Sequence, residues 1–446
     1  MASRRGEAQD VGRVALPPTP VGHRVGWLLR QLSGAAPPAS DEELQANITA
    51  DDPKDLLDRL ASTLEGFDVV DVTASSDTEL TVWVACPNGR EWEMTCTVAA
   101  AAPHPIGRVG LERALPPGMD VRPAGPDDND AILEVSRQTP VVLGDTSVTI
   151  DLGPDFFAYV RLMEKSLVMV ATDDGAVVGV HCGGTYPVRM GGQLYRMGMV
   201  QHSRILPDYG RLGLWGRMNS HLGRAGASAP NDGDGPPPPL ATGAYIGLEN
   251  EAAHRLARNS WSCRPFRVTL PCRRAATSGA EPFRRATPDD AEEIVRIINA
   301  CHDHEELFFP YTVASLAARL TRAPDLYSWS NVMIGKGAVA GVWHAGQQRT
   351  RMTADGPTTS IRGLVLDYGF LPGYEDELAS VLESCCHEGA RRGMTHLSIF
   401  TSAPSPGSAL VRSLGDDTEV YELVTPRTLE PEGTDKRGVY VDQIYF

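Results

Sequence analysis

Two stretches of the chain repeat each other at one fixed spacing. Residues 121–135, VRPAGPDDNDAILEV, match residues 283–297, FRRATPDDAEEIVRI. Residues 175–180, GAVVGV, match residues 337–342, GAVAGV. The offset is 162 residues in both cases, from 283 − 121 and from 337 − 175. Two separated matches at the same offset indicate an internal duplication of one fold.

The duplication predicts two copies, residues 120–275 and residues 281–446, with one order of elements. Each begins with a short strand that ends at a Pro-Asp-Asp turn, where an Asp can cap the helix that follows. Apolar residues at helical spacing come next, then a hairpin with Gly at its turn, a long strand, a Pro, a second helix and another strand. A Gly- and Pro-rich insert over residues 224–240 and a linker over residues 273–281 separate these elements.

The first 115 residues have a different pattern. We predict a disordered tail over residues 1–16 and a small α+β accessory domain over residues 17–115. The expected helices are Val21–Leu32 and Asp41–Leu64, and the expected strands are Phe67–Thr73, Glu79–Ala85 and Glu91–Val98. Asn88-Gly89 marks a hairpin turn between the last two strands.

Charge and composition exclude several classes of function. With 57 acidic and 41 basic residues, the formal net charge is −16, which disfavours general binding to nucleic acid or to an anionic membrane. No run approaches the roughly 18 apolar residues of a spanning helix, and no apolar segment of a signal peptide follows the N-terminal arginines. The eight cysteines show no CxxC or Cys/His metal spacing. We therefore predict a cytoplasmic protein with reduced thiols, no metal, and no nucleic-acid or membrane partner.

The stretch Leu206–Trp215, LPDYGRLGLW, lies between the long strand of the first copy, residues 195–205, and its second helix, residues 213–222. Free N–H groups at a helix N-terminus suit the charges of a pyrophosphate, and glycine permits close approach of the backbone. The alternative is a tight strand-to-helix turn without a ligand. The glycines and possible phosphate-binding cations here are Gly210, Gly213, Gly216, Arg211, Arg217 and Arg224.

The order of elements in both copies resembles the GNAT (GCN5-related N-acetyltransferase) superfamily, and Leu206–Trp215 looks like its acyl-CoA pyrophosphate loop. The family pattern is Gln or Arg, two residues, Gly, one residue, then Gly or Ala. Those positions hold Gly210, Gly213 and Trp215 here, so the central Gly alone matches. The resemblance implies an α+β / α/β fold class, with two tandem GNAT-like domains of mixed, mostly antiparallel sheet flanked by helices, preceded by a small α+β domain.

The resemblance also implies an acetyl-CoA-dependent N-acyltransferase that acts on the amine of a small molecule. Acyl-CoA is the co-substrate, and its pantetheine arm pairs with backbone around Ser203–Ile205, where the strand splays from the next one. A backbone N–H at Ile205 or Leu206 would polarise the thioester carbonyl. The implied cofactor-binding residues are Ser203, Arg204, Ile205, Leu206, Gly210, Arg211, Leu212, Gly213, Leu214, Trp215, Gly216 and Asn250.

Catalytic candidates follow from position along the chain. An acceptor amine must lose a proton, and His202, with an ordinary pKa suited to neutral pH, or Glu249 could take it. Ordinary hydrogen bonding is the alternative for each. The general acid of the family is a Tyr about seven residues after an Asn; Asn250 fits the Asn, but the Tyr position is Ala257. Tyr245 or Tyr209 could substitute as the acid, or the thiolate could leave without help.

The second copy departs from the loop pattern. Its run is Leu371–Leu378, LPGYEDEL, with three carboxylates in the turn that would face phosphate. Carboxylates repel a pyrophosphate, so we predict that this copy has a degenerate CoA loop and serves the structure or the acceptor site. His302–Glu306, HDHEE, has metal-ligating residue types but no partner cluster, so we predict a solvated helix end or the wall of an acceptor pocket.

Two tandem members of the family help to narrow the function. Mycothiol synthase is expected to keep its working loop in the C-terminal copy, whereas the better loop here is N-terminal. Residues 103–107, PHPIG, end a segment that looks like the accessory domain of β-lactamase-like hydrolases from clavam-type clusters. These features favour a resemblance to the tandem acetyltransferase of clavulanic acid biosynthesis, and hence a role in antibiotic biosynthesis.

Two other functions stay open. The chain could be a catalytically weak or inactive acyl-CoA or metabolite-binding protein on the same scaffold, or a protein-interaction scaffold that binds no CoA. The oligomeric state is predicted as monomer or homodimer, because tandem copies already resemble a dimer.

Overall fold

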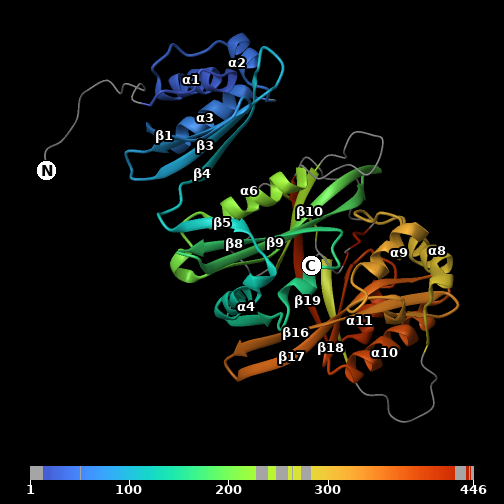
Figure 1. Cartoon of the computed structure of the whole chain (residues 1–446). Helices are drawn as coiled ribbons and strands as arrows, with labels where there is room; N and C mark the ends of the chain where they lie inside the picture. Colours follow the sequence, from blue (N-terminus) through green and yellow to red (C-terminus); the bar gives the residue numbers. More distant parts are fainter. Residues whose placement is uncertain are drawn as a thin grey trace. The chain divides into compact units, whose positions relative to one another are not determined.

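The computed structural model shows a chain that divides into two compact units (Figure 1). The first comprises residues 1–117 together with 211–217, and the second comprises residues 118–210 and 218–446. Among the described residues, no helix combines the length and the apolar character that crossing a bilayer requires. The structure describes residues 14–50, 52–143, 145–227, 240–247, 260–263, 265–272, 283–426, 438–440 and 442. Most of the predicted tail, most of the insert, the linker, Glu249 and Asn250 lie outside them.

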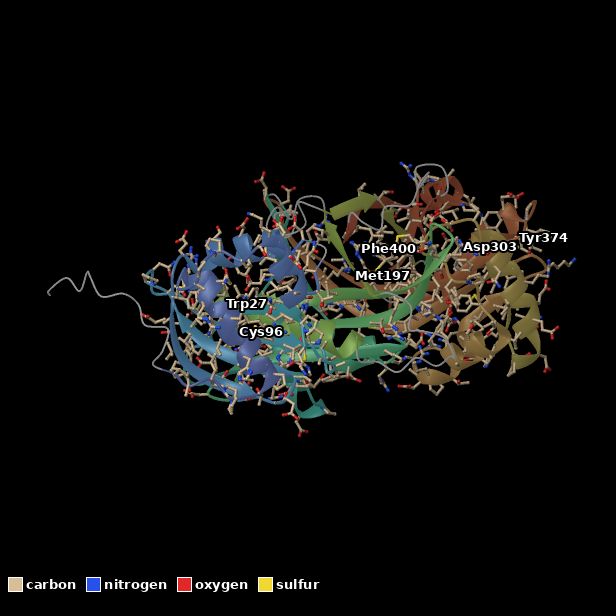
Figure 2. All side chains as sticks on the ribbon, turned by 90° about the horizontal axis from the view of Figure 1, so that it is seen from above. Trp27, Cys96, Met197, Asp303, Tyr374 and Phe400 are labelled. Carbon is tan, nitrogen blue, oxygen red and sulfur yellow. The ribbon has the colours of Figure 1, made fainter. Side chains whose placement is uncertain are left out.

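The first unit is an antiparallel four-stranded sheet with three helices. Its elements are α1 (Pro20–Ser33), α2 (Asp41–Asn47), α3 (Pro53–Leu64), β1 (Asp68–Ser75), β2 (Glu79–Ala85), β3 (Glu91–Val98) and β4 (Ile106–Arg113), in the strand order β1-β2-β3-β4. The helix predicted over residues 41–64 is two helices, because Pro53 starts a new helix and disfavours helical backbone at the residue before it. Figure 2 labels Trp27 on α1 and Cys96, which is fully buried on β3. The small α+β fold is confirmed, with β4 as an unpredicted strand.

The second unit contains one continuous sheet. The sheet path runs β14-β15-β16-β17-β18-β13-β19-β11-β10-β9-β8-β5. Its pairs are antiparallel except β10 with β11 and β17 with β18, so the predicted mixed, mostly antiparallel arrangement is confirmed. The bounds are β5 (Met119–Pro123), β8 (Lys165–Asp173), β9 (Ala176–Met190), β10 (Gln193–Ile205), β11 (Leu240–Gly247), β13 (Pro265–Pro271), β14 (Arg284–Arg285), β15 (Val332–Ile334), β16 (Ala338–Thr353), β17 (Gly356–Phe370), β18 (His396–Ser402) and β19 (Asp417–Pro426). Three short strands lie off this path: β6 (Val141–Leu143), β7 (Thr146–Asp151) and β12 (Ser260–Cys263).

The two copies exchange strands in the middle of this sheet. β13 precedes the second copy in sequence, yet it pairs with β18 and β19 of that copy. β19, the last strand of the second copy, pairs in turn with β11 of the first copy. Met197 on β10 and Phe400 on β18 are both buried within this unit (Figure 2). The exchange joins the copies into a single structural body.

Helices cover both faces of the sheet in each copy. Figure 1 shows α8 and α10 beside the strands of the second copy. There, Trp343 and Leu366 pack with α8, whereas their strand neighbours Val342 and Val365 pack with α10. This separation follows from the alternation of side chains along a strand. The helices are α4 (Asn129–Gln138), α5 (Phe156–Val160), α6 (Leu214–Ala227), α8 (Ala291–His302), α9 (Val313–Arg322), α10 (Glu375–Arg391) and α11 (Ser408–Leu414).

The repeated Arg and Asp of the duplication make the same contact in both copies. Arg122 donates two hydrogen bonds of 2.8 Å to Asp128, and Arg284 donates bonds of 2.7 and 2.6 Å to Asp290. Each carboxylate also accepts a backbone N–H, from Gly125 or from Thr287, at 2.8 Å. The hydrogen bond to the arginine is the main reason why the pKa of each Asp is lowered. The pair therefore fixes the strand-to-helix turn that opens each copy.

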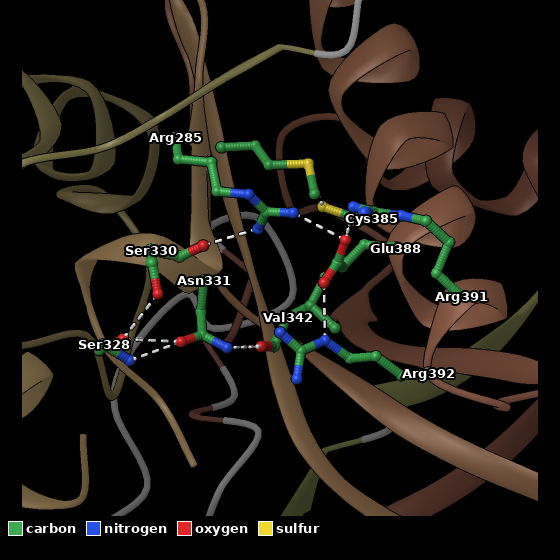
Figure 3. Close-up of polar contacts among 10 residues, drawn as sticks. Arg285, Ser328, Ser330, Asn331, Val342, Cys385, Glu388, Arg391 and Arg392 are labelled. Carbon is green, nitrogen blue, oxygen red and sulfur yellow. Dashed lines mark hydrogen bonds and ion pairs between the residues drawn. The ribbon is translucent and has the colours of Figure 1, made fainter. Parts of the chain in front are cut away.

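A second set of contacts ties the start of the second copy to its long helix. Glu388 on α10 accepts hydrogen bonds from Arg285 at 2.7 Å and from Arg392 at 2.6 Å (Figure 3). Nearby, the side chain of Asn331 donates to the carbonyl of Val342 at 3.1 Å and so anchors β16. The bonds from Arg285 and Arg392 satisfy the carboxylate of Glu388, which is only 4% exposed, as a buried charge requires.

Candidate functional site

The strands β10 and β11 separate partway along their length. Their parallel pairing covers Arg196–Val200 on β10 and Leu240–Ala244 on β11, and it ends there. From Ala244 onward, β11 pairs with β19 on its other edge. Among the described residues, no strand pairs with the edge of β10 from Gln201 to Ile205 on that side. This is the splay that the resemblance implied, and such an edge can accept an extended chain as an added strand.

A β-bulge interrupts β10 within this open segment. The register against β9 shifts between Gln201 and Arg204, and His202 has a left-handed backbone with a φ of 49°. The second copy has the same device at Asp367, which also has a φ of 49° and also lies four residues before a Leu-Pro pair. A non-glycine residue in this conformation is strained, and bulges re-aim side chains next to functional sites. Both copies thus aim one polar side chain away from the regular strand.

The imidazole of His202 lies among aromatic rings. Its ring centroid is 4.6 Å from that of Tyr159 and 5.9 Å from that of Phe156, both in edge-to-face geometry. Its Nε2 atom is buried and has no hydrogen-bond partner among the described residues. Burial first, and then the charges of Arg204 and Arg349, lower the pKa of His202 to about 3. The expected pKa near neutrality is therefore not found, and the imidazole is neutral at physiological pH.

The corresponding residue of the second copy is fully paired. Asp367 is 2% exposed and accepts hydrogen bonds from Tyr311 at 2.8 Å, Arg319 at 2.9 Å and Tyr327 at 2.9 Å. Arg319 also donates to Asp442 at 3.0 and 2.9 Å. A closed network of this kind leaves no group available for a ligand. The two bulges therefore differ in chemistry. His202 has a ring nitrogen without a partner among the described residues, whereas both carboxylate oxygens of Asp367 accept hydrogen bonds from neighbouring side chains.

The low pKa of His202 predicts a pH-dependent stability. The folded pKa of about 3 lies below the ordinary value of 6.5, so the unfolded chain binds the proton first and acidification favours unfolding. Between pH 7 and pH 5 this residue should cost about 2 kcal/mol of the free energy of unfolding. Urea titrations of His202→Gln at both pH values should show that much less loss than the parent chain. An unchanged pH dependence would contradict the buried, neutral imidazole.

The predicted cofactor-binding residues of β10 occupy different positions in the ladder. The N–H of Leu206 donates to the carbonyl of Val178 at 2.9 Å and is therefore already used. Because N–H groups alternate in direction along an antiparallel strand, the N–H of Ile205 points toward the side that β11 leaves open. Ser203 Oγ is hydrogen-bonded to His181, and Arg204 donates to the Ser203 carbonyl at 2.8 Å. Ile205, rather than Leu206, can polarise a carbonyl at the open edge.

The loop after β10 has the predicted backbone features. Pro207–Tyr209 form a 3₁₀ turn, and Gly213 has a φ of 77° directly before α6 begins at Leu214. Gly213 and Gly216 are both exposed, as close approach of a ligand to the backbone requires. The first N–H groups of α6 have no partner within the helix. In sequence, α6 begins nine residues after the end of β10, from 214 − 205.

Two side chains named for this loop are engaged elsewhere. The hydroxyl of Tyr209 donates to Asp173 at 2.8 Å, at the β8–β9 turn. Within the first unit, Arg217 forms ion pairs with Glu93 and with Glu112, the latter at 3.1 Å. Arg211 is exposed. Tyr209 is thereby a poor general acid, and Arg217 a poor phosphate ligand in this conformation.

The equivalent turn of the second copy is occupied by its own carboxylate. Glu377, in the first turn of α10, accepts the backbone N–H groups of Lys336 at 2.9 Å and Gly337 at 2.7 Å. Leu378 is fully buried beside it. This geometry supports the prediction that the second copy does not bind a pyrophosphate here, which itself stays a prediction.

The run His302–Glu306 is a solvated helix end only in part: Asp303 and His304 are exposed, but the other three residues are buried, and the alternative of an acceptor-pocket wall stays a prediction. His302 is 0%, Glu305 2% and Glu306 4% exposed. His302 bonds to Glu305 and to the carbonyl of Tyr368, the latter at 2.8 Å, because a buried charge needs partners. Within the described ranges, no group of three or more His, Cys, Asp and Glu side chains is arranged to hold a metal ion.

Of the remaining predicted catalytic residues, Tyr245 lies on β11, where its backbone pairs with Leu423. Sequence reasoning missed Arg349, which with Arg204 adds to the effect of burial in lowering the pKa of His202, and Arg267, whose own pKa is lowered by burial and then by the charge of Arg349. A signal for Arg267 does exist: in PFRVTLP, residues 265–271, alternation places it on the face opposite the buried Val268 and Leu270.

The chain has a tandem GNAT-like fold: two copies of a mixed sheet with a splayed parallel pair and flanking helices. It is similar to Saccharomyces cerevisiae N-myristoyltransferase with bound myristoyl-CoA, with a TM-score of 0.51 and 8% identity over 74% of this chain and 90% of that chain. GCN5-related N-acetyltransferases from Sphaerobacter thermophilus (TM-score 0.43, 14% identity, 71% of this chain and 98% of that one) and Kribbella flavida (TM-score 0.37, 12% identity, 69% of this chain and 71% of that one) are also similar. No family model matches the chain, and no curated protein matches it by sequence. At these identities the likeness establishes the fold.

Proposed function

We propose that this chain is an acyl-CoA-dependent N-acyltransferase whose first copy, residues 120–275, holds the acyl-CoA. The observation that carries the proposal is the edge of β10 that no described strand pairs with, with its bulge at His202 and with a glycine-containing helix start following later in the sequence. The second copy, residues 281–446, has a degenerate loop and supports the first. The small-molecule acceptor, and a place in β-lactam or clavam metabolism, remain predictions from the sequence.

The geometry supports a direct transfer. The pantetheine arm lies along Gln201–Ile205 as an added strand, and the pyrophosphate meets the N–H groups from Arg211 to Gly216. The N–H of Ile205 binds the thioester oxygen as negative charge develops on it. The amine nitrogen attacks the carbonyl carbon, a C–N bond forms, the C–S bond breaks, and the proton lost by the amine ends on the CoA thiol.

Proton removal is the step that this chain supports least. A histidine with a pKa of about 3 is a weak base, and the position of the family's Tyr is Ala257. These two facts favour the second candidate, an acyl-CoA-binding protein that is weakly active or inactive. The same fold would then bind the coenzyme without turning it over.

A calorimetric titration with acetyl-CoA, combined with a thiol-release assay on a panel of small amines, tests the proposal. We expect one site per chain and release of CoA thiol with at least one amine. One site without release with any amine would support the binding protein instead. The absence of any binding heat at millimolar acetyl-CoA would leave only a duplicated scaffold.

A further inference from the structure

Three arginines of the second unit form ion pairs with one carboxylate, and two further arginines belong to the same electrostatic group. Glu419 on β19 forms ion pairs with Arg267, with Arg351 at 3.2 Å and with Arg362 at 3.3 Å. It also accepts the hydroxyl of Tyr421 at 2.8 Å, so its oxygens already have four donors. The other members of the group are Arg204 on β10 and Arg349 on β16. Five cations against one anion give this group a formal charge of +4.

Three nitrogen atoms of these arginines are buried without a hydrogen-bond partner in the part of the chain that the structure describes. Arg267 is 1% exposed, and its Nε and Nη1 atoms have no hydrogen-bond partner among the described residues. The Nε atom of Arg349 is in the same state, although its Nη2 donates to Gln347 at 3.2 Å. Leaving a charged donor buried and unpaired costs several kcal/mol. An arrangement of arginines that carries this cost indicates that a bound anion accepts hydrogen bonds from the unpaired N–H groups.

The rings beside Arg267 define a dry environment on one side. Its guanidinium carbon lies 5.3 Å from the ring centroid of Tyr421 and 5.9 Å from that of Phe400. Burial, followed by the charge of Arg349, lowers the pKa of Arg204 to about 10 and lowers that of Arg267 as well. The arginines therefore repel one another, and Glu419 does not neutralise them. In a medium of low dielectric constant, one added negative charge would be held strongly.

The arginine group adjoins the open edge of β10. Arg204 and Arg349 are close enough to His202 to add to the effect of burial in lowering its pKa. Tyr159 packs against His202. Burial raises the pKa of Tyr159, and the charges of Arg349 and Arg267 act in the opposite direction. An anion held by these arginines would therefore lie beside the bulge. The remainder of the same molecule could then reach the strand edge where the thioester is proposed to lie.

We propose that Arg204, Arg267 and Arg349 bind a carboxylate of the acceptor, so that the acceptor is an amino acid or another amine that carries a carboxylate. The inference rests on the proposed function for the identity of the molecule, while the anion site rests on the arginines alone. A carboxylate fits better than a phosphate because a dianion is costlier to take out of water.

The site can be tested without coenzyme and without knowing the acceptor. The melting temperature of the full chain is measured in rising sodium acetate, sodium phosphate, and acetamide, the uncharged analogue of acetate, with sodium chloride keeping the ionic strength equal. We expect acetate to raise Tm saturably by about 2–4 °C, with acetamide inert. Phosphate should act only at higher concentration. Saturation at lower concentrations of phosphate than of acetate would overturn the carboxylate, and no saturable shift with either anion would overturn the site.

A pair of variants locates the effect. In Arg349→Met the acetate shift should disappear, while the protein without acetate should melt no lower, because a half-buried cation with an unpaired Nε among the described residues has been removed. Arg296→Met is the matched control, since Arg296 is exposed and pairs with Glu293 on α8. This control should keep the full acetate shift, and an acetate shift that survives in Arg349→Met would overturn the assignment. The acetyl-CoA titration is separate, so one binding site for coenzyme with no acetate effect would refute this inference alone.

Discussion

Gly213→Glu is expected to abolish acetyl-CoA turnover, with a loss of about a thousandfold or more in kcat/KM. The new carboxylate would stand where the proposed pyrophosphate meets the start of α6, and like charges in such a position cost several kcal/mol. Gly213 also has a φ of 77°, which side-chain-bearing residues adopt at a cost of about 1–2 kcal/mol. Thiol release at saturating amine, and calorimetry with acetyl-CoA, give the two readouts.

Two further substitutions separate charge from backbone strain. Gly213→Ala carries the same strain without the charge, and its Cβ would approach Arg113 Cβ at 3.0 Å, so we expect a loss of only about tenfold. Gly216→Ala meets nothing within 4 Å and should bind acetyl-CoA as the parent chain does. If Gly213→Glu bound the coenzyme with unchanged affinity, the loop could not be its site.

The local features of the fold were accessible to sequence reasoning because neighbouring residues determine them. The bounds of β2 and β3 were predicted correctly, since strict alternation and the Asn88-Gly89 turn fix both strands. The Pro-Asp-Asp turns were predicted from the duplication, although the arginine that binds each Asp was recognised only as part of the match. A repeat shows which residues recur in both copies, but it does not show which of their atoms form contacts.

The non-local features could not be predicted in the same way. The exchange of β13 and β19 between copies depends on pairing between strands about 150 residues apart, from 417 − 265. The alternation of apolar residues along a strand does not show which other strand it pairs with. The same holds for the candidate site. His202 was named for its place on the chain, but its strained backbone and its lowered pKa arise from the bulge and from the arginines around it. Arg267 and Arg349 come from strands of different copies, so only the folded sheet brings them together.

The buried carboxylate of Asp367 gives the second large expectation. Asp367→Asn should lower the free energy of unfolding by about 3–5 kcal/mol, because it removes one charge from a desolvated pair while Arg319 stays buried. Asn tolerates the left-handed backbone at this position and keeps the side-chain shape, so the loss reports charge rather than packing. Urea unfolding at neutral pH measures it. Asp303→Asn is the matched control, because Asp303 is 63% exposed in its pair with Arg189 and should change the free energy by less than about 1 kcal/mol.

Asp367→Asn also tests whether the second copy has a structural role only. If the second copy is structural, Asp367→Asn should keep the kcat and the acetyl-CoA affinity of the parent chain at temperatures where both are folded. A variant with unchanged stability but no turnover would place a catalytic residue in the second copy. The closed network of Tyr311, Arg319, Tyr327 and Asp442 would then have a role in the reaction. The present geometry argues against that outcome, because each oxygen of Asp367 already accepts a hydrogen bond from within the protein.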